Sequence, residues 1–89
     1  MIKIIKTEQT GDRTIRLFFS DGAQAELDFG WVLERHTVLT ERLSDPKVFG
    51  SFFLELGALC WPNGLELSPA SLYERARQEG VLIKSEEVA

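Results

Sequence analysis

The pattern of apolar and polar positions predicts a meander of three antiparallel strands in the N-terminal third of the chain. Residues 2–7 form a short β-branched run with polar flanks, and residues 14–19 alternate except for one extra phenylalanine. Residues 23–29 alternate cleanly, which is typical of a strand with one buried and one solvated face. The Ser-Asp-Gly sequence at residues 20–22 is a strong hairpin signal between the second and third strands.

The middle of the chain shows shorter and weaker patterns. Residues 31–35 favour one helical turn after Gly30, and residues 40–44 fit no single pattern. Asp45 followed by proline is suited to cap and begin another short helical turn, which Gly50 would end. We therefore expect irregular, partly helical structure after the meander.

Two further strands are predicted after this segment. Residues 51–56 predict a fourth strand, and residues 58–61 predict a fifth strand that follows a turn at Gly57. Alternation in the fourth strand places three apolar side chains inward, namely Phe52, Leu54 and Leu56.

The strongest local signals occur just before the main helix. Pro-Asn-Gly at residues 62–64 is turn chemistry, because proline fixes φ and the next two residues tolerate positive φ. Ser68 and Pro69 are suited to cap and begin a helix that runs to about Glu79 and ends at Gly80. Its apolar face carries Leu72, Tyr73 and Ala76, and its other face carries an i,i+4 pair of Arg75 and Glu79.

These elements predict one α+β domain over residues 1–89, with an ordered core over residues 2–83. We expect an antiparallel sheet of about five strands, beginning with the three-strand meander, with one main C-terminal helix packed on it. Residues 81–83 are apolar enough for a last short strand or for docking on the core, and residues 84–89 are expected to fray.

The charge balance narrows the classes of function. Ten basic and fourteen acidic residues give a net charge of −4, which disfavours sequence-independent binding to nucleic acid. The weakest hypothesis is nucleic-acid binding through basic residues that are interleaved with acids, namely Lys3, Lys6, Arg13 and Arg16. One cysteine, no signal-peptide pattern and no long apolar run predict a cytoplasmic protein with no membrane span.

No pattern typical of a catalytic, metal or cofactor site is found. His36 and Cys60 are the only residues of their kinds, and they lie in different predicted elements. The scattered carboxylates are typical of a solvated face, and no glycine-rich phosphate loop occurs. The sequence therefore predicts no cofactor and no catalytic residue.

Aromatic residues are the remaining candidates for a functional surface. The chain has six Phe, two Trp and one Tyr. Alternation places Phe18 and Phe53 opposite their phenylalanine neighbours, so a sheet covered on one face only would expose them. Either they form a surface for a protein partner or for self-association, or a second layer such as the segment around Trp31 covers them. Trp61 is expected to be buried, and its exposure would place it on the partner surface instead.

A pocket is the competing interpretation. The turn from Trp61 to Glu66 and the segment from Asp28 to Trp31 would supply an aromatic wall and a carboxylate to a small ligand or substrate. The candidate contacts for a partner or ligand are Phe18, Phe53, Asp28, Trp31, Trp61, Asn63 and Glu66.

Several short motifs in a fixed order resemble a known family. They are Phe18-Phe19-Ser20-Asp21-Gly22, Leu27-Asp28, Leu43-Ser44-Asp45-Pro46 with Phe49, and Trp61-Pro62-Asn63-Gly64-Leu65-Glu66-Leu67-Ser68-Pro69 with Leu72-Tyr73. Together they look like domain-of-unknown-function family 2442. The resemblance implies a small α+β domain with an antiparallel sheet, and it brings no catalytic residues. Members resemble small bacterial proteins that in some cases accompany another small protein as its presumed antitoxin.

Some relatives carry a C-terminal helix-turn-helix. The residues after the main helix leave no room for one, so we expect no DNA binding by this chain alone. The family often has Asp where this chain has Glu66, whose longer side chain would bond differently if it caps the turn. We interpret the protein as a non-enzymatic, antitoxin-like interaction module, with the ligand-binding or enzymatic pocket as the alternative.

Overall fold

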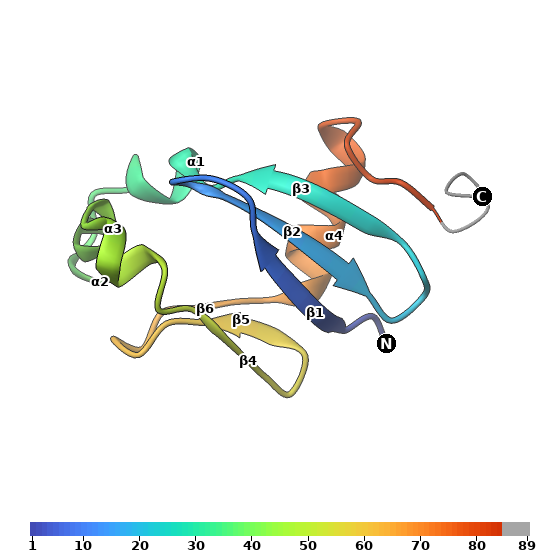
Figure 1. The fold of residues 1–89 in the computed structure, drawn as a ribbon, viewed down its shortest axis with the longest axis horizontal. Coiled ribbons are helices and arrows are strands. Elements are labelled where there is room, and N and C mark those ends of the chain that lie inside the picture. Colours follow the sequence, from blue (N-terminus) through green and yellow to red (C-terminus); the bar gives the residue numbers. More distant parts are fainter. Residues whose placement is uncertain (85–89) are drawn as a thin grey trace.

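The computed structural model describes residues 1–84, which form two three-stranded antiparallel sheets, several short helices and one longer helix (Figure 1). The α+β class and the C-terminal helix are confirmed. The prediction of one sheet is wrong, because the six strands of the described part divide into sheets of order β1-β2-β3 and β4-β5-β6.

The first sheet is the predicted meander of β1 (Ile4–Gln9), β2 (Thr14–Phe19) and β3 (Gln24–Asp28). The register pairs Ile15 with Leu27, and these residues are fully buried on the inner face. The opposite face carries the polar positions of β2 and β3 together with Phe18, which the alternation also places there.

The second sheet consists of β4 (Phe53–Glu55), β5 (Ala58–Cys60) and β6 (Glu66–Leu67). The Pro-Asn-Gly turn folds the chain back, so that Leu67 pairs with Leu59. The sequence did not predict β6, because a strand of two residues is too short to show a period. This third strand gives the second half of the chain a sheet of its own.

The prediction that Leu56 faces inward is wrong. Glu55 pairs with Ala58, so Leu56 and Gly57 form a two-residue hairpin loop. Leu56 has a φ of +52° and is 92% exposed. The tight turn, and not the strand alternation, sets the direction of this side chain.

Short helices connect the two sheets. They are α1 (Gly30–Leu33), α2 (Val38–Glu41), the 3₁₀ helix η1 (Arg42–Ser44) and α3 (Pro46–Phe49). The predicted cap is confirmed, because Asp45 Oδ1 accepts a hydrogen bond from Lys47 N at 2.9 Å. Residues 40–44, for which the sequence predicts no single structure, are helical. Thr37 and Thr40 form a capping box at the start of α2.

The main helix, α4 (Pro69–Gln78), lies behind the meander in Figure 1 and is capped as predicted. Ser68 Oγ accepts a hydrogen bond from Ser71 N at 3.3 Å, and Gly80 leaves the helix with a φ of +73°. Leu72 and Ala76 are buried, so the predicted apolar face contacts the core.

The segment after α4 docks on the edge of β3. Ile83 and Gln24 exchange two backbone hydrogen bonds of 2.8 Å, which form an isolated bridge. This agrees with the expected last short strand or docking segment at residues 81–83. The expected fraying of residues 84–89 concerns residues that, apart from Lys84, lie outside the described part.

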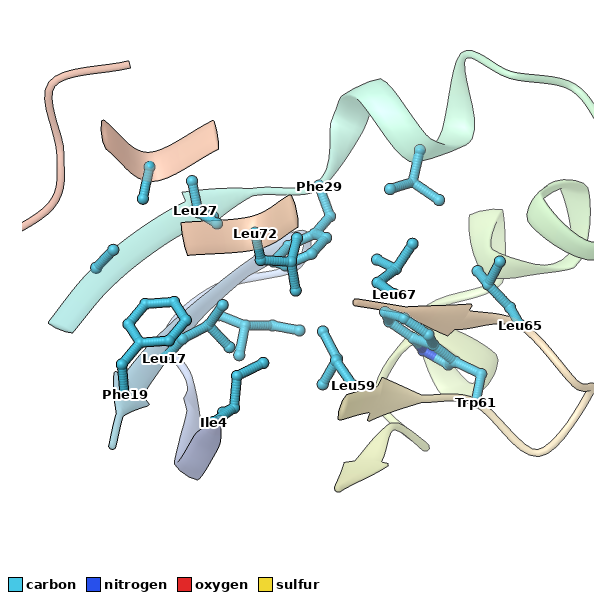
Figure 2. Packing of buried hydrophobic residues seen from close by; sticks show 14 of the residues in the cluster. Ile4, Leu17, Phe19, Leu27, Phe29, Leu59, Trp61, Leu65, Leu67 and Leu72 are labelled. Atoms are coloured by element: carbon cyan, nitrogen blue, oxygen red, sulfur yellow. The ribbon is translucent and has the colours of Figure 1, made fainter. Parts of the chain in front are cut away.

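One cluster of buried apolar side chains joins both sheets and α4 (Figure 2). Trp61 belongs to it with 1% exposure, and its Nε1 donates a hydrogen bond to Phe49 O at 2.8 Å. The Trp61 ring also lies 6.3 Å from the rings of Phe29 and Phe52. Trp61 is therefore a core residue and not part of an exposed surface.

Candidate interaction surface

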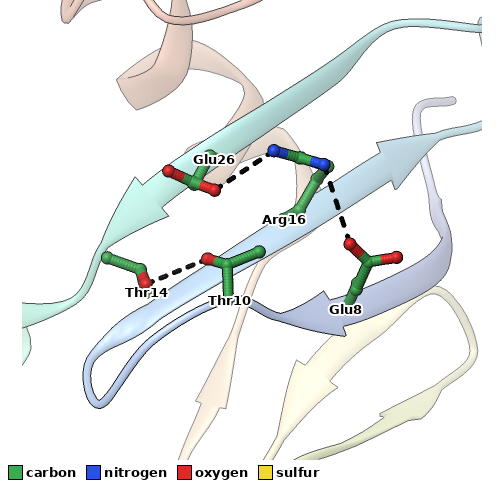
Figure 3. Close-up of polar contacts among 5 residues, drawn as sticks. All are labelled: Glu8, Thr10, Thr14, Arg16 and Glu26. Carbon is green, nitrogen blue, oxygen red and sulfur yellow. Dashed lines mark hydrogen bonds and ion pairs between the residues drawn. The ribbon is translucent and has the colours of Figure 1, made fainter.

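The outer face of the first sheet carries a ladder of charges. Arg16 on β2 reaches Glu8 on β1 at 3.6 Å and Glu26 on β3 at 3.2 Å (Figure 3). Phe18 is half-buried on this face, with Lys6 Nζ 5.1 Å from its ring centroid. The Lys6 side chain therefore covers part of the Phe18 ring, and no second layer of structure in the described part of the chain does so. This contact leaves little apolar area exposed on the outer face.

The four basic residues considered for nucleic acid are dispersed. Arg16 lies between two carboxylates, and Lys6 stands over Phe18. Lys3 packs near the β4–β5 loop, whereas Arg13 lies beside the start of α1. The residues that the structure describes thus do not bring these four side chains to one basic patch.

The β4–β5 hairpin loop has an unusual residue at its first position. Leu56 and Gly57 have φ angles of +52° and +83°, which define a type I′ turn. Asn-Gly is the favoured pair for this turn, because Asn tolerates positive φ, whereas a leucine there costs about 1–2 kcal/mol. The 92% exposure of Leu56 means that packing within the domain offsets little of this cost.

A second backbone irregularity lies next to this loop. Ile4 pairs with Phe19 and Lys6 pairs with Phe18, so Ile5 is the extra residue of a β-bulge. Ile5 is 64% exposed. Because bulges re-aim side chains at sheet edges, the bulge accounts for an isoleucine that points to solvent from β1.

The bulge and the hairpin loop are in direct contact. Ile4 N donates a hydrogen bond to Gly57 O at 2.9 Å, and β1 lies alongside β4. A Cβ on Gly57 would lie 2.7 Å from Lys3 Cβ, so only glycine permits this approach. The loop is therefore held against β1 at a fixed position.

Phe53 completes the exposed apolar residues of this region. It is 42% exposed on β4 and pairs across the strand with Cys60, which is buried. We refer to Ile5, Phe53 and Leu56 as the hairpin patch. Ile5 and Leu56 are adjacent to the two residues of the Ile4–Gly57 hydrogen bond, which makes this group of exposed apolar residues a candidate interaction site.

Two charged side chains accompany the hairpin patch. Lys3 lies against Gly57, and Glu55 precedes Leu56 on β4. Among residues 1–84 neither side chain forms an ion pair. Burial raises the pKa of the nearby Cys60 thiol, with further contributions from the carboxylates of Glu66 and Glu55, so this cysteine is a poor nucleophile.

A hollow lies between α1 and α4, next to β6. Its volume is about 770 Å³, and its lining includes Trp31, Arg35, Glu66 and Arg75. The guanidinium carbons of Arg75 and Arg35 lie 3.8 Å and 4.8 Å from the centroid of the Trp31 ring. The Nε1 atom of Trp31 is buried and has no hydrogen-bond acceptor among the described residues.

The remaining predicted contacts have structural roles elsewhere. Asp28 Oδ1 accepts a hydrogen bond from Gly30 N at 2.7 Å, at the start of α1. Asn63 accepts a hydrogen bond from Leu65 N at 3.2 Å and donates one to Leu39 O at 2.8 Å. Asn63, and not Glu66, therefore caps the turn, and the structure brings only Trp31 and Glu66 of the predicted pocket together.

The sequence analysis placed Leu56 inward and considered Lys3 only as a contact for nucleic acid. It did not single out Ile5 or Glu55. The available signal was the Leu-Gly pair between two strand-like runs, where a two-residue hairpin favours Asn-Gly. No comparable signal marks Ile5, because a bulge depends on the pairing of two strands.

The fold and this surface define a small α+β domain with two antiparallel sheets, a C-terminal helix and an exposed hairpin loop. A family model described as "Protein of unknown function (DUF2442)" matches residues 5–78, so the chain belongs to this family. No curated protein and no solved structure matches the chain significantly.

Two further observations concern the described part as a whole. None of its helices has the length and apolar character needed to cross a membrane. No three side chains of the His, Cys, Asp and Glu types lie close enough within residues 1–84 to hold a metal ion together.

Proposed function

We propose that the protein is a non-enzymatic protein-interaction module that docks through the hairpin patch. The observation that carries this proposal is Leu56, which is nearly fully exposed and has positive φ at the tip of a two-residue loop. A residue that breaks a local folding rule without a gain in packing is a candidate for a functional role.

The geometry around Leu56 supports docking at this place. Ile5 is turned outward by a bulge, and Phe53 lies on the adjoining strand β4. The hydrogen bond between Ile4 and Gly57 fixes the loop against β1, so the loop loses little conformational freedom when a partner binds.

The proposal includes an antitoxin-like role. The resemblance to family members that accompany a presumed toxin supports this choice. A cytoplasmic location is also part of the proposal, because the free, buried Cys60 thiol is typical of proteins in a reducing compartment.

The proposed function is tested by comparing the Leu56→Asn variant with the unchanged protein as baits in extracts of the native host. We expect a partner, identified by mass spectrometry, to bind the unchanged protein and to be lost from the variant. Val38→Asn is the matched control, because Val38 is 86% exposed on α2 outside the hairpin patch. Equal capture by all three baits would contradict docking through Leu56.

A second candidate function is small-ligand binding in the hollow between α1 and α4. The meeting of Trp31 and Glu66 in its lining favours this alternative, since a ligand site combines an aromatic wall with a few polar groups. A ligand screen by thermal shift, repeated with Glu66→Gln, tests it. A stabilising ligand whose effect survives the substitution would count against this site.

A further inference from the structure

We propose that the partner bound by the hairpin patch is a second copy of this chain, in a two-fold symmetric dimer. This inference rests on the proposed function, because it uses the same surface. In a two-fold interface each residue of the patch meets the same patch of the other copy, so the surface has to be complementary to itself.

The charges beside the patch satisfy this requirement. Lys3 lies against Gly57 on one side of the loop, and Glu55 directly precedes Leu56 on β4. Neither has an ion-pair partner within residues 1–84, so both are available to a partner. A two-fold arrangement places Lys3 of each copy against Glu55 of the other and forms two ion pairs around an apolar centre.

The apolar centre consists of the exposed side chains that the backbone presents. Leu56 projects from the hairpin tip, and Ile5 projects from the bulge beside it. Two copies bury both leucines, which removes the most exposed large apolar side chain of the second sheet from water. The rigid attachment of the loop to β1 means that the surface is formed before association.

The first experiment is sedimentation velocity over a concentration series up to about 1 mM, where even an association of millimolar strength is visible. The unchanged protein is expected to dimerise reversibly. Leu56→Asn should raise the dissociation constant about 100-fold or more, because each dimer loses two buried leucines worth at least about tenfold each. Val38→Asn should leave the dissociation constant unchanged.

The second experiment tests the charge pairing. Lys3→Glu and Glu55→Lys should each weaken the homodimer, because each places like charges opposite one another twice. A mixture of the two variants should form a mixed dimer more tightly than either variant forms its own, by about tenfold, because opposite charges then meet at both positions. This behaviour is specific to a two-fold pairing of these two residues.

The outcomes separate this inference from the proposed function. A monomer at all concentrations, or a dimer that is indifferent to Leu56→Asn and to the charge exchange, overturns the dimer. If a different protein is still captured through Leu56, the interaction module stands with another partner. If no partner depends on Leu56 in either experiment, both proposals are overturned.

Discussion

Leu56 combines positive φ, nearly full exposure and a large apolar side chain at one position. Each of these features is unfavourable for an isolated domain, and Gly57 beside it shows that the loop otherwise follows turn chemistry. At the scale of single residues, the hairpin tip therefore breaks local folding rules, and for this reason we propose it as the docking site.

Leu56→Asn is expected to increase the free energy of unfolding by about 1 kcal/mol, because Asn suits the first position of a type I′ turn. Urea denaturation of the monomeric form measures the effect as a higher midpoint with an unchanged slope. Leu56→Ala is the control, since alanine removes the apolar side chain without suiting positive φ. A lower midpoint for Leu56→Asn would mean that the leucine packs within the domain after all.

Secondary-structure elements could be predicted where their chemistry is local. β2 and β3 show clear alternation, and α4 carries its own cap and its own glycine stop. β6 could not be predicted, because its two residues form a strand only through pairing with β5. The exposure of Leu56 likewise depends on the register of β4 with β5 and not on the sequence pattern of β4.

One contact between elements makes stability depend on pH. Tyr73 on α4 donates a hydrogen bond of 2.6 Å to Asp21 Oδ2 in the β2–β3 turn. This bond lowers the pKa of Asp21 below its ordinary value of 3.8, with a smaller contribution from the backbone N–H of Ala23. A carboxyl with a lowered pKa in the folded state stabilises the fold above its ordinary pKa and loses this effect as the pH falls through the lowered value.

Tyr73→Phe is therefore expected to destabilise the domain slightly at neutral pH and not at strongly acidic pH, where Asp21 is protonated. The Phe19 ring, 5.0 Å from that of Tyr73, keeps an aromatic neighbour in the variant. Urea midpoints at about pH 6 and about pH 2 measure the difference. An equal loss of stability at both values would show that the hydroxyl acts through something other than the Asp21 charge.

On the scale of the whole molecule, the two sheets depend on one shared core. Leu59, Leu65 and Leu67 from the second half of the chain lie in the same cluster as Leu17 and Phe19 from the meander. The sequence predicted the buried faces of β2 and β3 and the burial of Trp61. It did not predict the division into two sheets, because the short helices between them separate β3 from β4 without any pattern that marks a new sheet.

Trp61→Ala is expected to lower the free energy of unfolding by about 3–5 kcal/mol, because the substitution leaves a cavity and an unpaired Phe49 carbonyl. Phe53→Ala is the matched control on the second sheet and should cost much less, since Phe53 is 42% exposed. Thermal and urea denaturation of the two variants measure the contrast. Similar losses for both would place Phe53 in the core and remove it from the hairpin patch.

The most direct test is a dilution series of uniformly labelled protein, followed by the amide ¹H–¹⁵N chemical shifts of each residue. The hairpin patch predicts concentration-dependent shifts that are confined to Lys3, Ile5 and residues 53–57. In Leu56→Asn these shifts should disappear. Shifts that do not change on dilution, or that map instead to the charged outer face around Arg16 or to the hollow at Trp31, would contradict docking through the hairpin patch to a second copy.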